Sequence, residues 1–261
     1  MTRTSAGRVR ELFVYPVKGL SAQPLDHTEL RPGEGVPYDR RYALARPDGA
    51  YRPGTREGLS KREFYALVSD HRLAGLGTHL DTETDVLTAR VGGHDVLRAG
   101  LRTERGRDGA ARFFARVLDL PAGVTPLLAR EPGRRFTDAA AAGDGPMGWI
   151  SLVNLASVRD LESRTGSVVD PRRFRANVLV DGLPAWSELE LIGQEFDLGG
   201  VRVRAVHRTK RCAATEVDPD TGRRDLPVVT LLDRTYGHQL MGVHLEVRTA
   251  GSVRRGSDLV L

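Results

Sequence analysis

Short apolar segments that end at glycine, proline or aspartate recur along almost the whole chain of 261 residues. Such segments are typical of β-strands joined by tight turns, and many in succession favour barrel-like β domains. The clearest pair, Val86–Val91 and Asp95–Leu97, flanks Gly92-Gly93 and predicts a hairpin. Further strand candidates are 8–17, 25–30, 38–45, 149–153, 178–180, 188–206, 228–232, 242–247 and 258–261. The sequence therefore predicts a mainly β protein with a few helices, in the α+β class.

Two segments have the period of a helix instead. Five apolar residues between positions 110 and 118 fall on one face of an amphipathic helix. A second helix is expected after Asn154, which is a candidate N-cap together with Ser151, and Gly166 is a candidate terminator. Between the two helices the composition and the period both change at 130–148. We therefore expect an N-terminal barrel-like domain, 1–125, and a second β domain, 126–261.

Cys212 is the single cysteine of the chain and follows Lys210 and Arg211. The alternating segment before it predicts a strand, and the Asp-Pro-Asp-Thr-Gly sequence at 218–222 predicts a turn after it. Cationic neighbours favour the thiolate, which is the form that attacks and binds metals. The alternative is a buried cysteine that packs as a small hydrophobe. A single cysteine excludes an intramolecular disulfide and a Cys-rich zinc or iron–sulfur site.

A second group of polar residues precedes the strand candidate 178–180. If that strand begins early, Arg173, Arg175 and Asn177 lie on one of its faces. Guanidinium groups bind phosphate in bidentate fashion, and an amide pairs with the edge of a heterocycle. The alternative is a solvated edge strand. The helix start at Asn154 is a further candidate anion site, with ordinary capping as the alternative.

The charge of the chain limits its partners. Lys and Arg total 39 against 34 Asp and Glu, which gives a net charge of +5 without a long basic run. Aromatic residues make up only 6% of the chain, which argues against a stacking platform for nucleic acid. The pattern favours a basic pocket for an anionic small molecule. Because no apolar run has the length of a membrane span or a secretory segment, we expect a cytoplasmic protein without membrane partners.

Four motifs in order resemble one known family. They are Tyr-Pro-Val-Lys-Gly at 15–19, Asp-Arg-Arg-Tyr at 39–42, Arg-Phe-Arg-Ala-Asn at 173–177 and the segment 211–222 that starts with Arg-Cys. This order resembles the MOSC proteins, which are named for the C-terminal domain of molybdenum cofactor sulfurase. With a preceding MOSC N-terminal β-barrel domain, the chain is similar to the amidoxime-reducing components.

The resemblance implies a molybdenum cofactor, Mo-molybdopterin, and a set of residues that holds it. Cys212 matches the family's metal ligand and is the implied catalytic residue. Lys210 departs from the small hydroxylic residue that relatives commonly carry there. The implied cofactor-binding residues are Lys18, Arg40, Asn154, Ser157, Arg175, Asn177, Lys210, Arg211 and Cys212.

The implied activity is the reduction of N-hydroxylated compounds such as hydroxylamines or amidoximes. Since the sequence has no cysteines for an iron–sulfur cluster, we expect electrons from a separate donor protein, of the ferredoxin or the cytochrome b5 type with its reductase. His207, His238 and Asp218 are candidate proton donors, with a structural role as the alternative for each. Two other functions stay open: a sulfur carrier or cofactor-delivery protein with a Cys212 persulfide, and a metal-free module that binds an anion.

Overall fold

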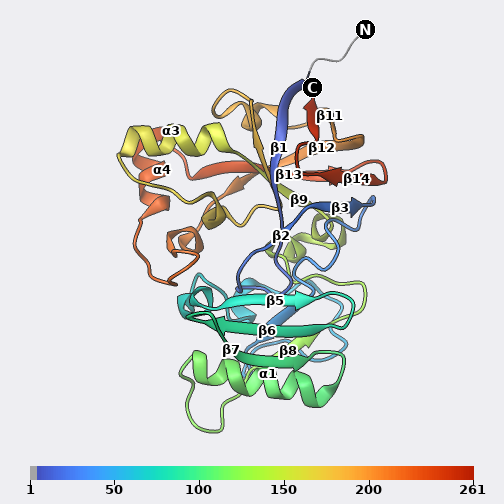
Figure 1. The fold of residues 1–261 in the computed structure, drawn as a ribbon, viewed down its shortest axis with the longest axis vertical. Coiled ribbons are helices and arrows are strands. Elements are labelled where there is room, and N and C mark those ends of the chain that lie inside the picture. Colours follow the sequence, from blue (N-terminus) through green and yellow to red (C-terminus); the bar gives the residue numbers. More distant parts are fainter. Residues whose placement is uncertain (1–4) are drawn as a thin grey trace.

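The computed structural model describes residues 5–261, so the first four residues of the predicted N-terminal domain lie outside the described part. Two β-rich parts are stacked along the long axis of the molecule (Figure 1). The upper part contains β1, β9–β15, α3 and α4, and the lower part contains β5–β8 and α1. The predicted fold class, mainly β with a few helices, is confirmed.

The upper part is a closed barrel. Its strands follow the order β10-β9-β13-β12-β11-β15-β1, and the ring closes because β1 also pairs with β10. β9 and β10 are parallel and are joined by α3, whereas the other neighbours are antiparallel. The barrel strands are β1 (Ser5–Val14), β9 (Ile150–Asn154), β10 (Val178–Asp181), β11 (Glu195–Leu198), β12 (Val201–Lys210), β13 (Leu240–Val247) and β15 (Asp258–Val260).

The start of the chain belongs to this barrel. Val9 and Leu12 of β1 are buried in one core with Val203 and Leu245. β2 (Gln23–Leu25) extends the sheet beside β1, and β3 (His27–Leu30) pairs with β14 (Gly251–Arg254). Strands from both predicted domains, 1–125 and 126–261, therefore build the barrel. The domain boundary at residue 125 stays a prediction.

The lower part is a three-stranded antiparallel sheet, a two-stranded pair and one helix. The hairpin predicted around Gly92-Gly93 is confirmed as β6 and β7. Helix α1 packs beside β7 and starts earlier than the apolar spacing predicted, because Thr103 caps a charged first turn by accepting a hydrogen bond from Gly106 N at 3.1 Å. The elements are β4 (Tyr42–Ala45), β5 (Gly77–Asp81), β6 (Val86–Val91), β7 (His94–Gly100), α1 (Glu104–Val117) and β8 (Leu127–Arg130).

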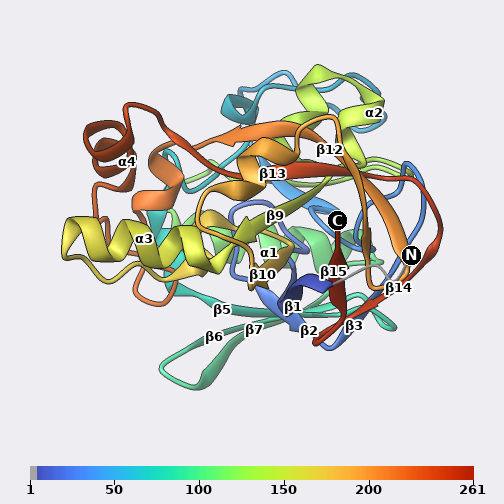
Figure 2. The same ribbon diagram turned by 90° about the horizontal axis from the view of Figure 1, so that it is seen from above.

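Helices α3 (Leu155–Thr165) and α4 (Val228–Tyr236) lie side by side on one flank of the barrel (Figures 1 and 2). The Asn154 cap and the left-handed Gly166 that ends α3 are confirmed. The strand predicted at 228–232 is wrong: Val228 and Leu232, four residues apart, bury one helical face. A short apolar run cannot distinguish a strand from a buried helix.

The strand predicted through 173–177 is also wrong. Asp170 caps a 3₁₀ turn, Pro171–Phe174, by accepting a hydrogen bond from Arg172 N at 2.8 Å. Arg175 then adopts a left-handed conformation with φ of 51°, which ends the alternation of faces before β10 begins. Likewise, Tyr38 and Arg40 have positive φ, so the predicted strand 38–45 starts only at Tyr42.

The remaining short elements connect the strands. They are α2 (Asp144–Met147) and the 3₁₀ turns Lys61–Glu63, His71–Gly75, Asp138–Ala142, Pro171–Phe174, Ser187–Leu191 and Ala213–Glu216.

Among residues 5–261, no helix combines the length and the apolar character needed to cross a bilayer.

Candidate functional site

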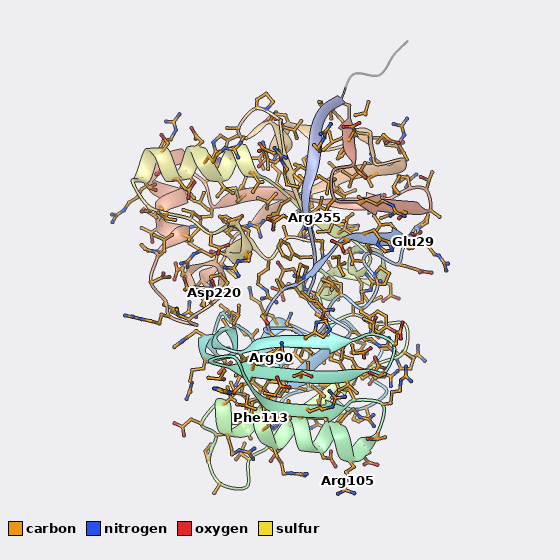
Figure 3. All side chains as sticks on the ribbon, in the orientation of Figure 1. Glu29, Arg90, Arg105, Phe113, Asp220 and Arg255 are labelled. Atoms are coloured by element: carbon orange, nitrogen blue, oxygen red, sulfur yellow. The ribbon has the colours of Figure 1, made fainter. Side chains whose placement is uncertain are left out.

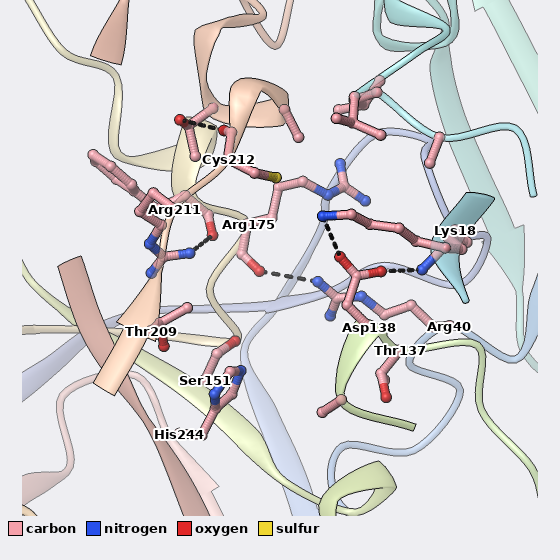
Figure 4. Close-up of a pocket in the computed structure, with 18 of the residues that line it drawn as sticks. Lys18, Arg40, Thr137, Asp138, Ser151, Arg175, Thr209, Arg211, Cys212 and His244 are labelled. Carbon is pink, nitrogen blue, oxygen red and sulfur yellow. Dashed lines mark hydrogen bonds and ion pairs between the residues drawn. The ribbon is translucent and has the colours of Figure 1, made fainter. Parts of the chain in front are cut away.

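A pocket of about 520 Å³ is lined by residues of the barrel, of the loops after β1 and of the segment 137–142 (Figure 4). This volume lies in the range of small-molecule and cofactor pockets. A second cleft, of about 420 Å³, shares Arg173 and Arg175 with it and extends to Arg90 and Asp220. The latter two residues are labelled in Figure 3. The charged or reactive residues of the first pocket include Lys18, Arg40, Lys61, Asp138, Arg175, His207, Lys210, Arg211, Cys212 and His244.

Cys212 lies two residues after the end of β12, just past a strand end as predicted. Its backbone is extended, and its carbonyl accepts hydrogen bonds from the backbone N and the Oγ1 of Thr215, both at 3.0 Å. These bonds fix the start of the next 3₁₀ turn. The thiol is free, half-buried and part of the pocket wall (Figure 4).

Arg211 is buried beneath this thiol and is bonded to backbone rather than to a carboxylate. Its Nε and Nη2 donate to the Met241 carbonyl, the Nε at 2.8 Å, and its Nη1 donates to the Phe174 carbonyl at 2.9 Å. Burial lowers the pKa of Arg211 to about 10, which still leaves it cationic at neutral pH. We call Arg211 and Cys212 the thiol side of the pocket.

Lys18, Arg40 and Arg175 form what we call the cation side. The ring of Tyr15 holds two of them, because the Cζ atoms of Arg40 and Arg175 each lie 4.4 Å from its centroid. Arg175 Nη1 also donates to the Leu20 carbonyl at 2.8 Å. Burial, together with the charge of Arg40, lowers the pKa of Arg175 to about 10. Cation–π contact and these bonds hold the two guanidinium groups beside each other at the pocket.

Lys18 completes the cation side from the loop after β1. Its Nζ donates to the Phe136 carbonyl at 2.9 Å and forms an ion pair with Asp138. Burial lowers the pKa of Lys18, and Asp138 opposes this effect. Burial alone would raise the pKa of Asp138, but Lys18, with Lys61 and Arg40, outweighs it and the net direction is downward. Each member of the pair therefore favours the charged form of the other.

Asn177 lines the pocket, but its amide is saturated within the protein. Its Oδ1 accepts from the backbone N of Ser151 at 3.1 Å and from the Ser151 Oγ at 2.9 Å. Its Nδ2 donates to the Phe13 carbonyl at 3.2 Å and to Asp39 Oδ1 at 3.0 Å. Because an amide has two donor and two acceptor positions, none remains for a heterocycle edge. Asn177 supports the wall through Ser151 and Asp39.

Asn154 and Ser157 are fully buried and do not line the pocket, so the structure does not bring these two predicted residues to the others. Asn154 accepts from Ala156 N at 3.1 Å and donates to the Pro184 carbonyl at 2.9 Å. The Ser157 hydroxyl donates its one hydrogen to the Glu188 carboxylate, whose two oxygens lie 2.9 and 2.8 Å from Oγ. The Asn154 amide caps α3, and the Ser157 hydroxyl secures a neighbouring turn through Glu188. Ordinary capping is the role that the sequence predicted as the alternative to an anion site.

Of the predicted proton donors, His207 lines the pocket, whereas Asp218 and His238 do not. Asp218 organises its own turn by accepting from the backbone N of Thr221 at 2.7 Å. His238 Nδ1 accepts from Leu240 N at 3.2 Å. Lys210 also lines the pocket, with an exposed side chain, as its place at the end of β12 predicts.

Trp149, Thr209 and His244 also line the pocket and were not predicted. His207 and His244 are paired across β12 and β13, and Trp149 packs against both, with ring centroids 5.8–6.2 Å apart. Burial, with Arg211 and His207, lowers the pKa of His244 to about 4, so it is neutral at pH 7. His244 Nδ1 and Thr209 Oγ1 are buried without a hydrogen-bond partner among the described residues. Only the register of β12 against β13 could have revealed this cluster.

The donor set fits a metal held by an organic cofactor better than a bare ion. Among residues 5–261, no group of three or more His, Cys, Asp or Glu side chains is arranged to hold a metal. Cys212 offers one soft sulfur ligand, and the cation side offers charge for a phosphate. A molybdenum-pterin cofactor, with its own dithiolene and its anionic group, matches both sides of the pocket.

Fold and site together define a class: β-barrel proteins in which one pocket combines a single thiol with a buried cationic cluster. The family model described as "MOSC domain" matches residues 142–260, and the family model described as "MOSC N-terminal beta barrel domain" matches residues 6–121. The chain belongs to the MOSC family that includes the amidoxime reducing components, as the sequence motifs predicted.

Individual relatives cover nearly the whole chain. Mitochondrial amidoxime reducing component 2 of Rattus norvegicus is 33% identical over 291 residues, which cover 97% of this chain and 82% of that protein. The Bos taurus protein of the same name is 26% identical over 297 residues, again with 97% and 82% coverage. Among solved structures, the YuaD protein of Bacillus subtilis covers 99% of this chain and 96% of its own, with 13% identity and a TM-score of 0.44.

Proposed function

We propose that this protein binds a molybdenum-pterin cofactor in the pocket and reduces N-hydroxylated compounds with electrons from a separate donor protein. The observation that carries the proposal is the meeting of the thiol side and the cation side on one cavity of about 520 Å³. The names of the relatives, which describe amidoxime reduction, support the reaction class.

Each side of the pocket has its own task. The Cys212 sulfur is the protein ligand of the metal, and Arg211, without a carboxylate partner, stabilises the thiolate. Lys18, Arg40 and Arg175 hold the anionic group of the cofactor. When bound, the cofactor supplies two-electron redox chemistry next to Cys212.

The overall reaction consumes two electrons and two protons for each N–O bond that is broken. A hydroxylamine R–NH–OH becomes R–NH₂, and the oxygen leaves as water. His207 is the candidate proton donor, because it lines the pocket, whereas Asp218 and His238 do not. His244, which is neutral at pH 7, stacks beside it with ring centroids 6.0 Å apart.

The electron donor, the substrate and the location of the protein are proposed as the sequence predicts. A ferredoxin, or a cytochrome b5 with its reductase, would supply the electrons, and the substrate is a small molecule that enters the pocket. We expect a cytoplasmic location, and neither nucleic acid nor a membrane as partner. The relatives named above are mitochondrial by name.

Turnover with an artificial donor tests the activity without the natural partner. The protein, produced in a host that makes the cofactor, is mixed with dithionite-reduced methyl viologen and benzamidoxime. We expect the dye to be reoxidised and benzamidine to form. Cys212→Ser should abolish both signals, whereas Asp144→Asn, which alters an 81% exposed side chain, should change neither. Failure of the molybdenum-loaded wild type to form benzamidine would contradict the proposed reaction.

A further inference from the structure

The segment 137–142 places a carboxylate inside the cation side. Asp138 is the first residue of a 3₁₀ turn, and its side chain reaches Lys18 within the pocket (Figure 4). The side chain of Lys18 is 8% exposed, whereas that of Asp138 is 58% exposed because it faces the cavity. The buried ammonium group is thus paired with an anion that lies on the open side.

Few contacts attach this carboxylate to the rest of the protein. Ala140 is the buried residue of its turn, and the turn packs against Gly58, where an added Cβ would lie 1.9 Å from the Ala140 carbonyl oxygen. Ala141 and Ala142 are exposed. Besides Lys18, the cation nearest to Asp138 is Lys61, whose Nζ lies 4.0 Å away. The Asp138 carboxylate is therefore held mainly by the Lys18 ion pair.

We propose that Asp138 is an internal counter-ion that a phosphate-bearing ligand must displace from Lys18, so that the pocket selects multiply charged anions. This inference rests on the anion-binding part of the proposed function. In the ligand-free protein, Asp138 neutralises a buried ammonium group that would otherwise have only the Phe136 carbonyl.

The charge balance explains the selectivity. A monovalent anion that replaces Asp138 exchanges one carboxylate-like charge for another and also competes with a tethered group at high effective concentration. A phosphate monoester carries nearly two charges at neutral pH and can contact Lys18, Arg40 and Arg175 together. It repels Asp138 at the same time, so binding and displacement of the carboxylate are coupled.

Titration with inorganic phosphate and with acetate tests the inference on the metal-free full chain, by calorimetry. We expect the wild type to bind phosphate and not acetate at the same concentration. Asp138→Asn should bind phosphate about tenfold more tightly, because a like charge has been removed, and should also bind acetate. Asp144→Asn is the matched control: it removes one negative charge from the same part of the chain, where Asp144 pairs with Arg134 at 3.0 Å.

Equal phosphate affinity in Asp138→Asn and the wild type would overturn the inference. An equal gain in phosphate affinity in Asp138→Asn and Asp144→Asn would overturn it as well. Hydrogen exchange of the wild type gives a test that needs no variant: saturating phosphate should lower the protection of amides 138–142. If phosphate binds and this protection stays the same, displacement does not occur. Neither measurement uses molybdenum or turnover, so failure here is distinguishable from failure of the proposed reaction.

Discussion

The thiol side and the cation side of the pocket differ in how their positive charges are balanced. On the thiol side, Arg211 is buried and bonded to backbone carbonyls, so its positive charge remains available to Cys212. On the cation side, Lys18 and Arg40 are each paired with a carboxylate, Asp138 and Asp39. The first arrangement leaves a positive charge for the thiol, whereas in the second the protein's own carboxylates balance the cations, and we propose that an incoming anion replaces one of them.

The two sides also differ in how the chain builds them. The thiol side consists of two consecutive residues directly after β12. The cation side brings together residues 18, 40 and 175 around Tyr15, and its stability depends on contacts between distant segments. We therefore expect substitutions on the thiol side to affect folding and metal retention, and those on the cation side to affect anion affinity.

The largest effect should come from Arg211→Met. Loss of the guanidinium leaves the Met241 and Phe174 carbonyls without these donors inside the protein, which should lower the free energy of unfolding by about 2–5 kcal/mol. Urea unfolding measures it. Arg208→Met is the control, since Arg208 also donates to a carbonyl, at 2.8 Å, but its side chain is 46% exposed. Equal stability of the two variants would show that Arg211 is not the clamp of the thiol side.

His244, near the thiol side, should make the stability of the protein sensitive to acid. Its folded-state pKa of about 4 lies below that of an unfolded histidine, so the folded protein binds fewer protons. Its stabilising contribution is therefore complete above about pH 6.5 and is lost as the pH falls toward 4. His244→Phe should reduce the stability lost between pH 7 and pH 4 by about 2–3 kcal/mol. Exposed His27→Gln is the control, and an unchanged acid profile in His244→Phe would refute this cause.

On the cation side, Tyr15→Leu should weaken phosphate binding by about three- to tenfold, because Arg40 and Arg175 lose the ring that both contact. Tyr15→Phe keeps the ring and loses only the hydroxyl, which donates to the Ala176 carbonyl at 3.3 Å. Calorimetric titration of both variants should therefore separate them. Equal loss in both would assign the effect to the hydroxyl rather than to the ring.

The smallest effect should lie outside both sides. Asn154→Ala removes a helix cap and should cost about 1 kcal/mol of stability. Because Asn154 does not line the pocket, phosphate affinity and molybdenum content should equal those of the wild type. If Asn154→Ala kept its stability but lost molybdenum, Asn154 would have to be counted among the cofactor-binding residues.

Local features of the site could be predicted from the sequence. The strand before Cys212, the turn after it and the cap of α3 each depend on residues that are neighbours in the chain. The direction in which Asn154 points was not predictable, because it depends on how β9 and α3 sit in the closed barrel. Its capping role was predicted as the alternative, and that alternative holds.

Long-range contacts were beyond sequence patterns. The period-2 interpretation of Arg173, Arg175 and Asn177 failed because a capped 3₁₀ turn and a left-handed residue precede β10. The contacts of Tyr15 with two guanidinium groups, and the Lys18–Asp138 pair, join residues that only the fold brings together. Four ordered motifs nevertheless identified the family, because each carries several of the residues that line the pocket.

The molybdenum content of the purified chain, measured beside that of Cys212→Ser, tests the central claim most directly. The account predicts about one molybdenum per chain in the wild type and almost none in Cys212→Ser, with unfolding midpoints that match when both are metal-free. Metal-free wild type with sulfane sulfur on Cys212, from a host that makes the cofactor, would instead indicate a sulfur carrier. Equal molybdenum in both proteins would contradict the assignment of Cys212 as the metal ligand.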